Sequence, residues 1–297
     1  MNSFFKIYGR VISVLGAIIL GALLPQFHVF SFLIQYFLML MLFLAFLGIE
    51  IQPRAFRKEM LWVLLANIAI AFLAYWVISF FDHTLALAAF ITAIAPTAIG
   101  SPVIISFIDG QVEYLVASIL LTNLSMALIV PISLPFLIGS HVSISVWQIL
   151  KPVVTVVFAP LILAYLVARL PEKAQTFIGQ GKRYSFTVWL VNLFIVCATA
   201  ADFIRNEDPS TIHFLLKIAL ISFVICVANF SLGALIGGRE HWQEASQALG
   251  QKNTSFVIWV ALTFINPLMA IGPTFYILYH NLYNSLQIYL FEKRRNV

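Results

Sequence analysis

Charged residues are scarce in this chain of 297 residues: they make up 10% of it, against 62% hydrophobic residues. A water-soluble domain could not hide so much apolar surface, and the mean hydropathy is +0.98. Cysteine is equally sparse, since Cys197 and Cys226 are the two in the chain and both fall in apolar stretches. Neither supports a disulfide framework or a metal site, and a small hydrophobic role is expected for both. The composition predicts one compact domain that crosses a membrane many times.

The sequence also lacks the groupings that membrane enzymes need. No nucleophile with a neighbouring base and no His, Asp or Glu cluster stands at membrane depth. We therefore expect no catalysis, no cofactor and no bound metal, and an integral-membrane enzyme is a less favoured alternative.

Breaks in hydropathy predict an all-α fold of ten spans, each about 20 residues long. They lie near residues 8–26, 30–51, 60–81, 85–108, 113–138, 147–170, 184–203, 212–236, 244–266 and 269–291. Pro25-Gln-Phe-His is a poor cleavage site for a signal peptidase, so the first span is expected to be retained.

Basic residues are distributed unevenly between alternate loops. Only Lys151 and Arg205 lie at one face. The positive-inside rule places the other face, and with it both termini, in the cytoplasm, as in a bacterial inner membrane. The net charge of +5 follows from this bias, so nucleic acid is not an expected partner, whereas lipid headgroups are. The residues on the cytoplasmic face are Lys6, Arg10, Arg54, Arg57, Lys58, Arg169, Lys173, Lys182, Arg183, Arg239, Lys293, Arg294 and Arg295.

Two spans contain helix-breaking residues near their centres. The fourth carries Pro96, Gly100 and Pro102, and the ninth carries Gly250-Gln251-Lys252-Asn253. Each is the fourth of five spans in its half of the chain, about 1–138 and 146–297. Because five is odd, the halves would have opposite orientations, which is typical of inverted-repeat transporters with a site at the midplane. Two accidental kinks are the plainer alternative.

Lys252 is the most informative of these residues. An ammonium near the middle of an apolar span is energetically expensive and is a hypothesis of a functional site by default. No carboxylate is an obvious partner, because Glu50, Asp202 and Glu244 all stand near span ends. The alternatives are that Lys252 extends to the interface or pairs with a polar neighbour.

Several motifs resemble the bile acid:sodium symporter family over nearly the whole chain. The ninth-span segment Ala248-Leu-Gly-Gln-Lys252-Asn253 is similar to the family's Glu-x-Gly-x-Gln-Asn. The tenth-span segment 266–281, ending in His280-Asn281, is similar to bacterial members. Thr122-Asn123 stands at the family's Ser-Thr pair, and Asn67 stands where the family usually has Gln.

The resemblance implies a panel of spans 1, 2, 6 and 7 and a core of spans 3–5 and 8–10. Spans 4 and 9 would cross at their breaks. The resemblance also implies alternating access and uptake of organic anions, from bile acids to small carboxylates such as pantoate, together with sodium.

The departures from the family concern its two sodium sites. The Glu is Ala248, the Gln is Lys252 and an Asn of the fourth span is Pro102, while Asn67, Thr122 and Asn123 stay polar. Loss of the carboxylate and gain of a cation disfavour Na⁺, which needs anionic or carbonyl oxygens.

The leading hypothesis is a secondary transporter of a small organic anion that does not need Na⁺. The Lys252 ammonium would take the place of a sodium ion; alternatively, Lys252 would release and rebind a proton during transport. The remaining alternatives are a Na⁺-coupled symporter with a reduced sodium site and a channel. His280 could equally be a structural, hydrogen-bonded histidine. The expected substrate contacts are Thr97, Ser101, Lys252, Asn253, His280 and Asn281.

Overall fold

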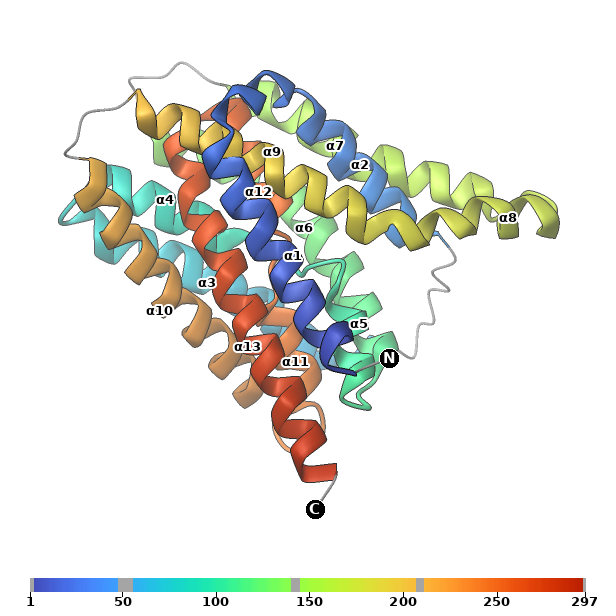
Figure 1. Cartoon of the computed structure of the whole chain (residues 1–297). Coiled ribbons are helices and arrows are strands. Elements are labelled where there is room, and N and C mark those ends of the chain that lie inside the picture. Colours follow the sequence, from blue (N-terminus) through green and yellow to red (C-terminus); the bar gives the residue numbers. More distant parts are fainter. Residues whose placement is uncertain (1–2, 48–55, 140–144, 207–210, 296–297) are drawn as a thin grey trace.

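The computed structural model describes residues 3–47, 56–139, 145–206 and 211–295. Every named secondary-structure element in these residues is an α-helix or a 3-10 helix (Figure 1). Glu50, Arg54 and the end of the second predicted span lie outside the described residues. In chain order the elements are α1 (Ser3–Leu23), η1 (Pro25–Phe30), α2 (Leu33–Phe46), α3 (Lys58–Ser79), α4 (His83–Ile94), α5 (Ser101–Phe107), α6 (Val112–Ile138), α7 (Val146–Val167), α8 (Glu172–Gly179), η3 (Gln180–Tyr184), α9 (Ser185–Arg205), α10 (Thr211–Gly237), α11 (Trp242–Gly250), α12 (Thr254–Phe264), η4 (Pro267–Ala270) and α13 (Ile271–Arg295).

The all-helical membrane fold expected from hydropathy is confirmed in this part of the chain. Five helical stretches are long and apolar enough to cross a membrane. Large apolar side chains such as Phe81, Phe136 and Leu235 are exposed on the outside, where lipid would cover them. The five stretches are Lys58–Ser79, Val112–Ile138, Val146–Val167, Glu172–Arg205 and His213–Gly237, and shorter apolar helices lie between them.

The fourth predicted span is broken into α4 and α5. Pro96 disfavours a helical backbone in the residue before it, and Ala95 accordingly adopts φ −52° and ψ 136°. Pro102 lies in the first turn of α5. Proline is tolerated there because the backbone N–H groups of the first turn have no acceptor within the helix. The proline positions therefore decide where one half-helix ends and the next begins.

The ninth predicted span is broken into α11 and α12 without any proline. Gln251, Lys252 and Asn253 leave the helical conformation between them. Gly250 ends α11 against the ring of Phe230, where a Cβ would lie 2.2 Å from a ring carbon. Glycine is required here by close packing.

The helices pack in recurring pairs. α3 packs against α4 and α10 against α11, while α1 packs against α9, and α2 against α7 and α9. α1 begins and α13 ends towards the same end of the bundle (Figure 1). Two elements are additional to the predicted spans: α8 and η3 occupy the connection between the sixth and seventh.

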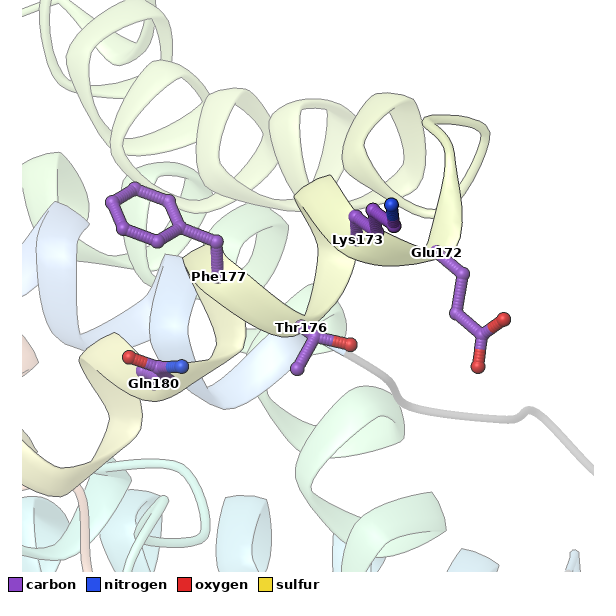
Figure 2. A pocket seen from close by; sticks show the side chains of 5 residues that line it. All are labelled: Glu172, Lys173, Thr176, Phe177 and Gln180. Atoms are coloured by element: carbon purple, nitrogen blue, oxygen red, sulfur yellow. The ribbon is translucent and has the colours of Figure 1, made fainter.

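An open surface hollow of 330 Å³ lies along α8 and η3 (Figure 2). Its lining residues point outward from the projecting helix, and none belongs to the predicted site. The hollow therefore marks the outer surface of α8 rather than a substrate cavity. The lining residues are Glu172, Lys173, Thr176, Phe177 and Gln180.

We expect Gly233→Ala to destabilise the protein, because a Cβ at Gly233 would lie 2.5 Å from the carbonyl oxygen of Ala245 in the adjacent α11. Overpacking of this kind costs about 1–3 kcal/mol. Gly16→Ala in α1 is the matched control, since a Cβ there meets nothing within 4 Å. Thermal unfolding in detergent should show a lower melting temperature for Gly233→Ala alone; equal melting temperatures would contradict the packing.

Candidate functional site

The two helix breaks meet and pair with each other. Thr97 and Lys252 form an isolated antiparallel bridge. The backbone N–H of Ala98 donates to the carbonyl of Gln251 at 2.7 Å, and the N–H of Asn253 donates to the carbonyl of Pro96 at 2.7 Å. Backbone groups that no helix satisfies are thus satisfied across the crossing, as hydrocarbon surroundings require.

Side chains of α6 hold the first break in place. The hydroxyl of Thr122 accepts from the N–H of Thr97 at 3.0 Å, and the amide of Asn123 donates to the carbonyl of Thr97 at 3.1 Å. The amide of Asn253 donates to Oδ1 of Asn123 at 3.2 Å. The hydroxyl of Thr97 in turn donates to the carbonyl of Ala248 at 2.6 Å. All five residues were predicted to belong to the site, and the structure brings them together.

Lys252 reaches from the second break to α3. Its side chain is 2% exposed, and Nζ donates to Oδ1 of Asn67. The amide nitrogen of Asn67 donates to the carbonyl of Ala95 at 3.2 Å, at the end of α4. Lys252 therefore does not extend to the interface; it is buried, pairs with a polar neighbour and is connected through Asn67 to the other break.

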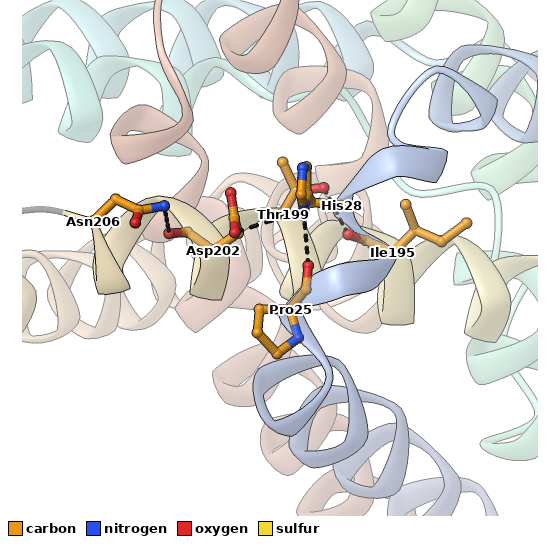
Figure 3. Close-up of polar contacts among 6 residues, drawn as sticks. All are labelled: Pro25, His28, Ile195, Thr199, Asp202 and Asn206. Carbon is orange, nitrogen blue, oxygen red and sulfur yellow. Dashed lines mark hydrogen bonds and ion pairs between the residues drawn. The ribbon is translucent and has the colours of Figure 1, made fainter.

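No carboxylate among the described residues forms an ion pair with Lys252. Glu244 accepts from the backbone N–H of Gln111 at 2.8 Å. Asp202 faces His28, with 3.6 Å between Oδ1 and Nδ1, as Figure 3 shows. An ammonium has three N–H donors, and Asn67 is the one acceptor that Lys252 has in the described part of the chain. Lys252 thus keeps donor capacity for a further partner.

Ser101 and Pro102 lie in the first turn of α5. The hydroxyl of Ser101 donates to the carbonyl of Ala98 at 2.9 Å, so it closes the turn after the break. Pro102 has no polar side chain to offer. This part of the predicted site shapes the backbone.

His280 and Asn281 lie on α13 and differ in their surroundings. His280 is buried against the edge of Tyr276, with ring centroids 5.7 Å apart, and its Nδ1 has no hydrogen-bond partner among the described residues. Tyr276 donates to the carbonyl of Gly250 at 2.7 Å, which places His280 near the second break. The half-buried Asn281 donates to the carbonyl of Ile277 in its own helix at 2.7 Å.

Four buried residues with polar side chains beside the crossing were not predicted: Asn192, Asn229, Ser255 and Tyr276. Asn229 of α10 donates to the hydroxyl of Tyr276 at 3.2 Å, and Asn192 of α9 donates to the hydroxyl of Ser255 in α12 at 3.3 Å. An asparagine within an apolar span is the signal that could have indicated Asn192 and Asn229. Tyr276 carries no such signal, because tyrosine is common at membrane interfaces.

A model of the Sodium Bile acid symporter family matches residues 32–207, which is more than half of the chain. The chain belongs to this family. A curated relative, "Uncharacterized protein YbaS" of Bacillus subtilis (strain 168), is 24% identical over 210 residues, or 68% of this chain and 67% of that protein. The expected family is confirmed, and its members are membrane transporters. The segment 248–253 lies outside the matched residues.

Two positions of the expected sodium sites lack side-chain oxygen atoms, and two amide oxygens beside the crossing accept hydrogen bonds within the chain. Ala248 and Pro102 contribute no side-chain oxygen, and the described residues hold no cluster of three His, Cys, Asp or Glu side chains. Oδ1 of Asn67 accepts from Lys252, and Oδ1 of Asn123 accepts from Asn253. These two amide oxygens are already used by N–H donors.

We expect Asn67→Leu to destabilise the protein strongly, because it removes the acceptor of a buried ammonium. The cost should be on the order of 3 kcal/mol, and the double variant Asn67→Leu/Lys252→Met should recover most of it, since two apolar groups leave no unpaired charge. Melting temperatures of the two single variants and the double variant complete the cycle. Additive effects would contradict a direct Lys252–Asn67 interaction.

Proposed function

We propose that this protein is a secondary transporter of a small organic anion that works without Na⁺, with the ammonium of Lys252 supplying the positive charge at the crossing. The observation that carries the proposal is the burial of Lys252 beside the paired breaks. Among the described residues Lys252 has no carboxylate partner, and its ammonium has N–H groups that donate no hydrogen bond. A substrate carboxylate is the counter-ion that such a group lacks.

The packing supports a division of the ten spans into two inverted halves, at about residues 1–138 and 146–297. The contact between α3 and α4 in the first half corresponds to the contact between α10 and α11 in the second. In the same way, the contact between α1 and α9 corresponds to the contact between α7 and α2. Inverted halves would exchange each pair with its counterpart.

The same contacts support a panel and a core. The panel consists of α1, α2, α7 and α9, which pack on one another; the core consists of α3 to α6 and α10 to α13, and carries both breaks. Movement of the core against the panel would expose the crossing to each side of the membrane in turn. An even number of spans, with both termini in the cytoplasm, agrees with α1 beginning and α13 ending towards the same end of the bundle.

The residues proposed for substrate binding fall into two groups, which differ in whether they contact the anion directly. Lys252 and His280 have polar atoms without partners in the described structure, so they are proposed to contact the anion directly. The others either hold the crossing or bond within their own helix, and are proposed to shape the site around the anion. These are Thr97, Ser101, Asn253 and Asn281.

Two features support independence from Na⁺. A cation at Lys252 repels a second cation nearby, and this repulsion is strong where little water screens it. The amide oxygens of Asn67 and Asn123 are also engaged. A proton is the coupling ion that the same site could carry instead, because a buried lysine can lose its proton. Proton coupling would appear as uptake driven by an imposed pH gradient without Na⁺.

We expect the protein in proteoliposomes to take up small carboxylates equally well in Na⁺ and K⁺. Lys252→Met should lower uptake about tenfold or more, which is the effect of losing one charge-assisted hydrogen bond to the substrate. Lys217→Met is the control, because Lys217 lies exposed on α10. Strict dependence on Na⁺ would show a Na⁺-coupled symporter with a reduced site, and unchanged uptake by Lys252→Met would remove the role of the lysine.

Restoring the family's side chains should restore a response to sodium. In Ala248→Glu/Lys252→Gln the carboxylate returns and the competing ammonium is lost, so Na⁺ should raise the melting temperature by a few degrees relative to K⁺. The parent protein should melt at the same temperature in both salts. A specific effect of Na⁺ on the parent would contradict the replacement of sodium by Lys252.

A further inference from the structure

A buried hydrogen bond between side chains links the panel to the core. Nδ2 of Asn192, on α9 of the panel, donates to Oγ of Ser255, in the first turn of α12, at 3.3 Å. Among the hydrogen bonds that the described residues form with one another, it is the one that joins the two groups of helices. Apolar side chains of the two groups also pack together in one core cluster.

Both side chains of this hydrogen bond are buried, and the amide oxygen of Asn192 is not satisfied by it. Asn192 is 0% exposed and Ser255 is 5% exposed, while Oδ1 of Asn192 has no hydrogen-bond partner among the described residues. An unsatisfied buried acceptor is unusual and costs free energy in the state that contains it. Ser255 follows Lys252 by three residues, so the bond lies immediately beside the proposed site.

The bond also lies on the side of the crossing that the panel covers. α12 packs against α2 and α9, and η4 packs against α9. The other half-helix at the crossing, α5, packs against α6, α11 and α13, which all belong to the core. The structure thus shows a state in which the panel closes over the α12 half of the crossing.

We propose that Asn192 is the gating residue of the transport cycle: its amide holds Ser255 while the α12 side is closed, and releases it when the core moves away from the panel. The inference rests on the proposed function, because the movement is that of alternating access. A neutral amide suits this role, since one hydrogen bond is weak enough to break in each cycle. Water entering the opened side would satisfy Oδ1 as well, which offsets the loss of the bond.

The first test joins the two positions covalently. Asn192→Cys/Ser255→Cys is made in a background in which the buried Cys197 and Cys226 are replaced by Ala, after uptake by that background is established. Oxidation should lower uptake about tenfold or more, and reduction should restore it, because a locked gate stops the conformational step. His28→Cys/Asp202→Cys is the matched control: this pair joins η1 to α9 within the panel (Figure 3), so its oxidation should leave uptake unchanged. Equal uptake by the oxidised and reduced Asn192/Ser255 pair would overturn the gate.

The second test needs no substrate. Ile258→Cys, one turn after Ser255 on α12, leaves the hydroxyl of Ser255 in place. In the background without Cys197 and Cys226, it is labelled with a membrane-impermeant maleimide in the presence of Asn192 and of Asn192→Leu, which keeps the volume but removes the amide. Loss of the bond should favour the open state and raise the labelling rate about fivefold, the factor expected for one hydrogen bond. Equal labelling rates would overturn the gate. Failure of the proposed function would look different: no anion would be taken up by any reduced protein, while the labelling rates would still differ.

Discussion

Two backbone hydrogen bonds, from Ala98 to Gln251 and from Asn253 to Pro96, support the rest of this structure. A helix broken inside a membrane leaves N–H and carbonyl groups that lipid cannot satisfy. Here each break satisfies backbone groups of the other, so the two broken helices stabilise each other. The crossing brings the fourth and ninth spans together, and α6 adds hydrogen bonds from Thr122 and Asn123 that fix the orientation of Thr97.

Lys252 extends this arrangement to α3. Its bond to Asn67, and the bonds of Asn67 to the end of α4, connect the charge of one break to the carbonyls of the other. A family that we expect to bind sodium at this crossing has here a member with an amine attached to the chain. An ammonium held covalently cannot dissociate with the substrate, so a gradient of that cation cannot drive transport. Under the proposed function, the energy would come from the substrate's own gradient or from protons.

The contact between the two proposed groups of helices is suited to movement. Its polar content in the described residues is the bond between Asn192 and Ser255, whereas polar bonds within each group are numerous. Apolar surfaces lose little specific interaction when they shift, because dispersion contacts are individually weak and re-form. Under the proposed function, strong polar bonds within the core and few across its boundary would allow the core to move as a unit.

Composition and hydropathy alone determined the membrane fold, since lipid imposes the length and apolar character of every span. The helix breaks at Pro96–Pro102 and Gly250–Asn253 could also be predicted, because proline position and a charged residue at midspan are local signals. The sequence could not show that Lys252 pairs with Asn67, 185 residues away, or that Asn192 meets Ser255. It also gave no sign of α8. Such pairings depend on how the helices pack in three dimensions. In the sequence, an asparagine within an apolar segment looks the same whether its side chain bonds a lysine, a backbone carbonyl or a neighbouring helix.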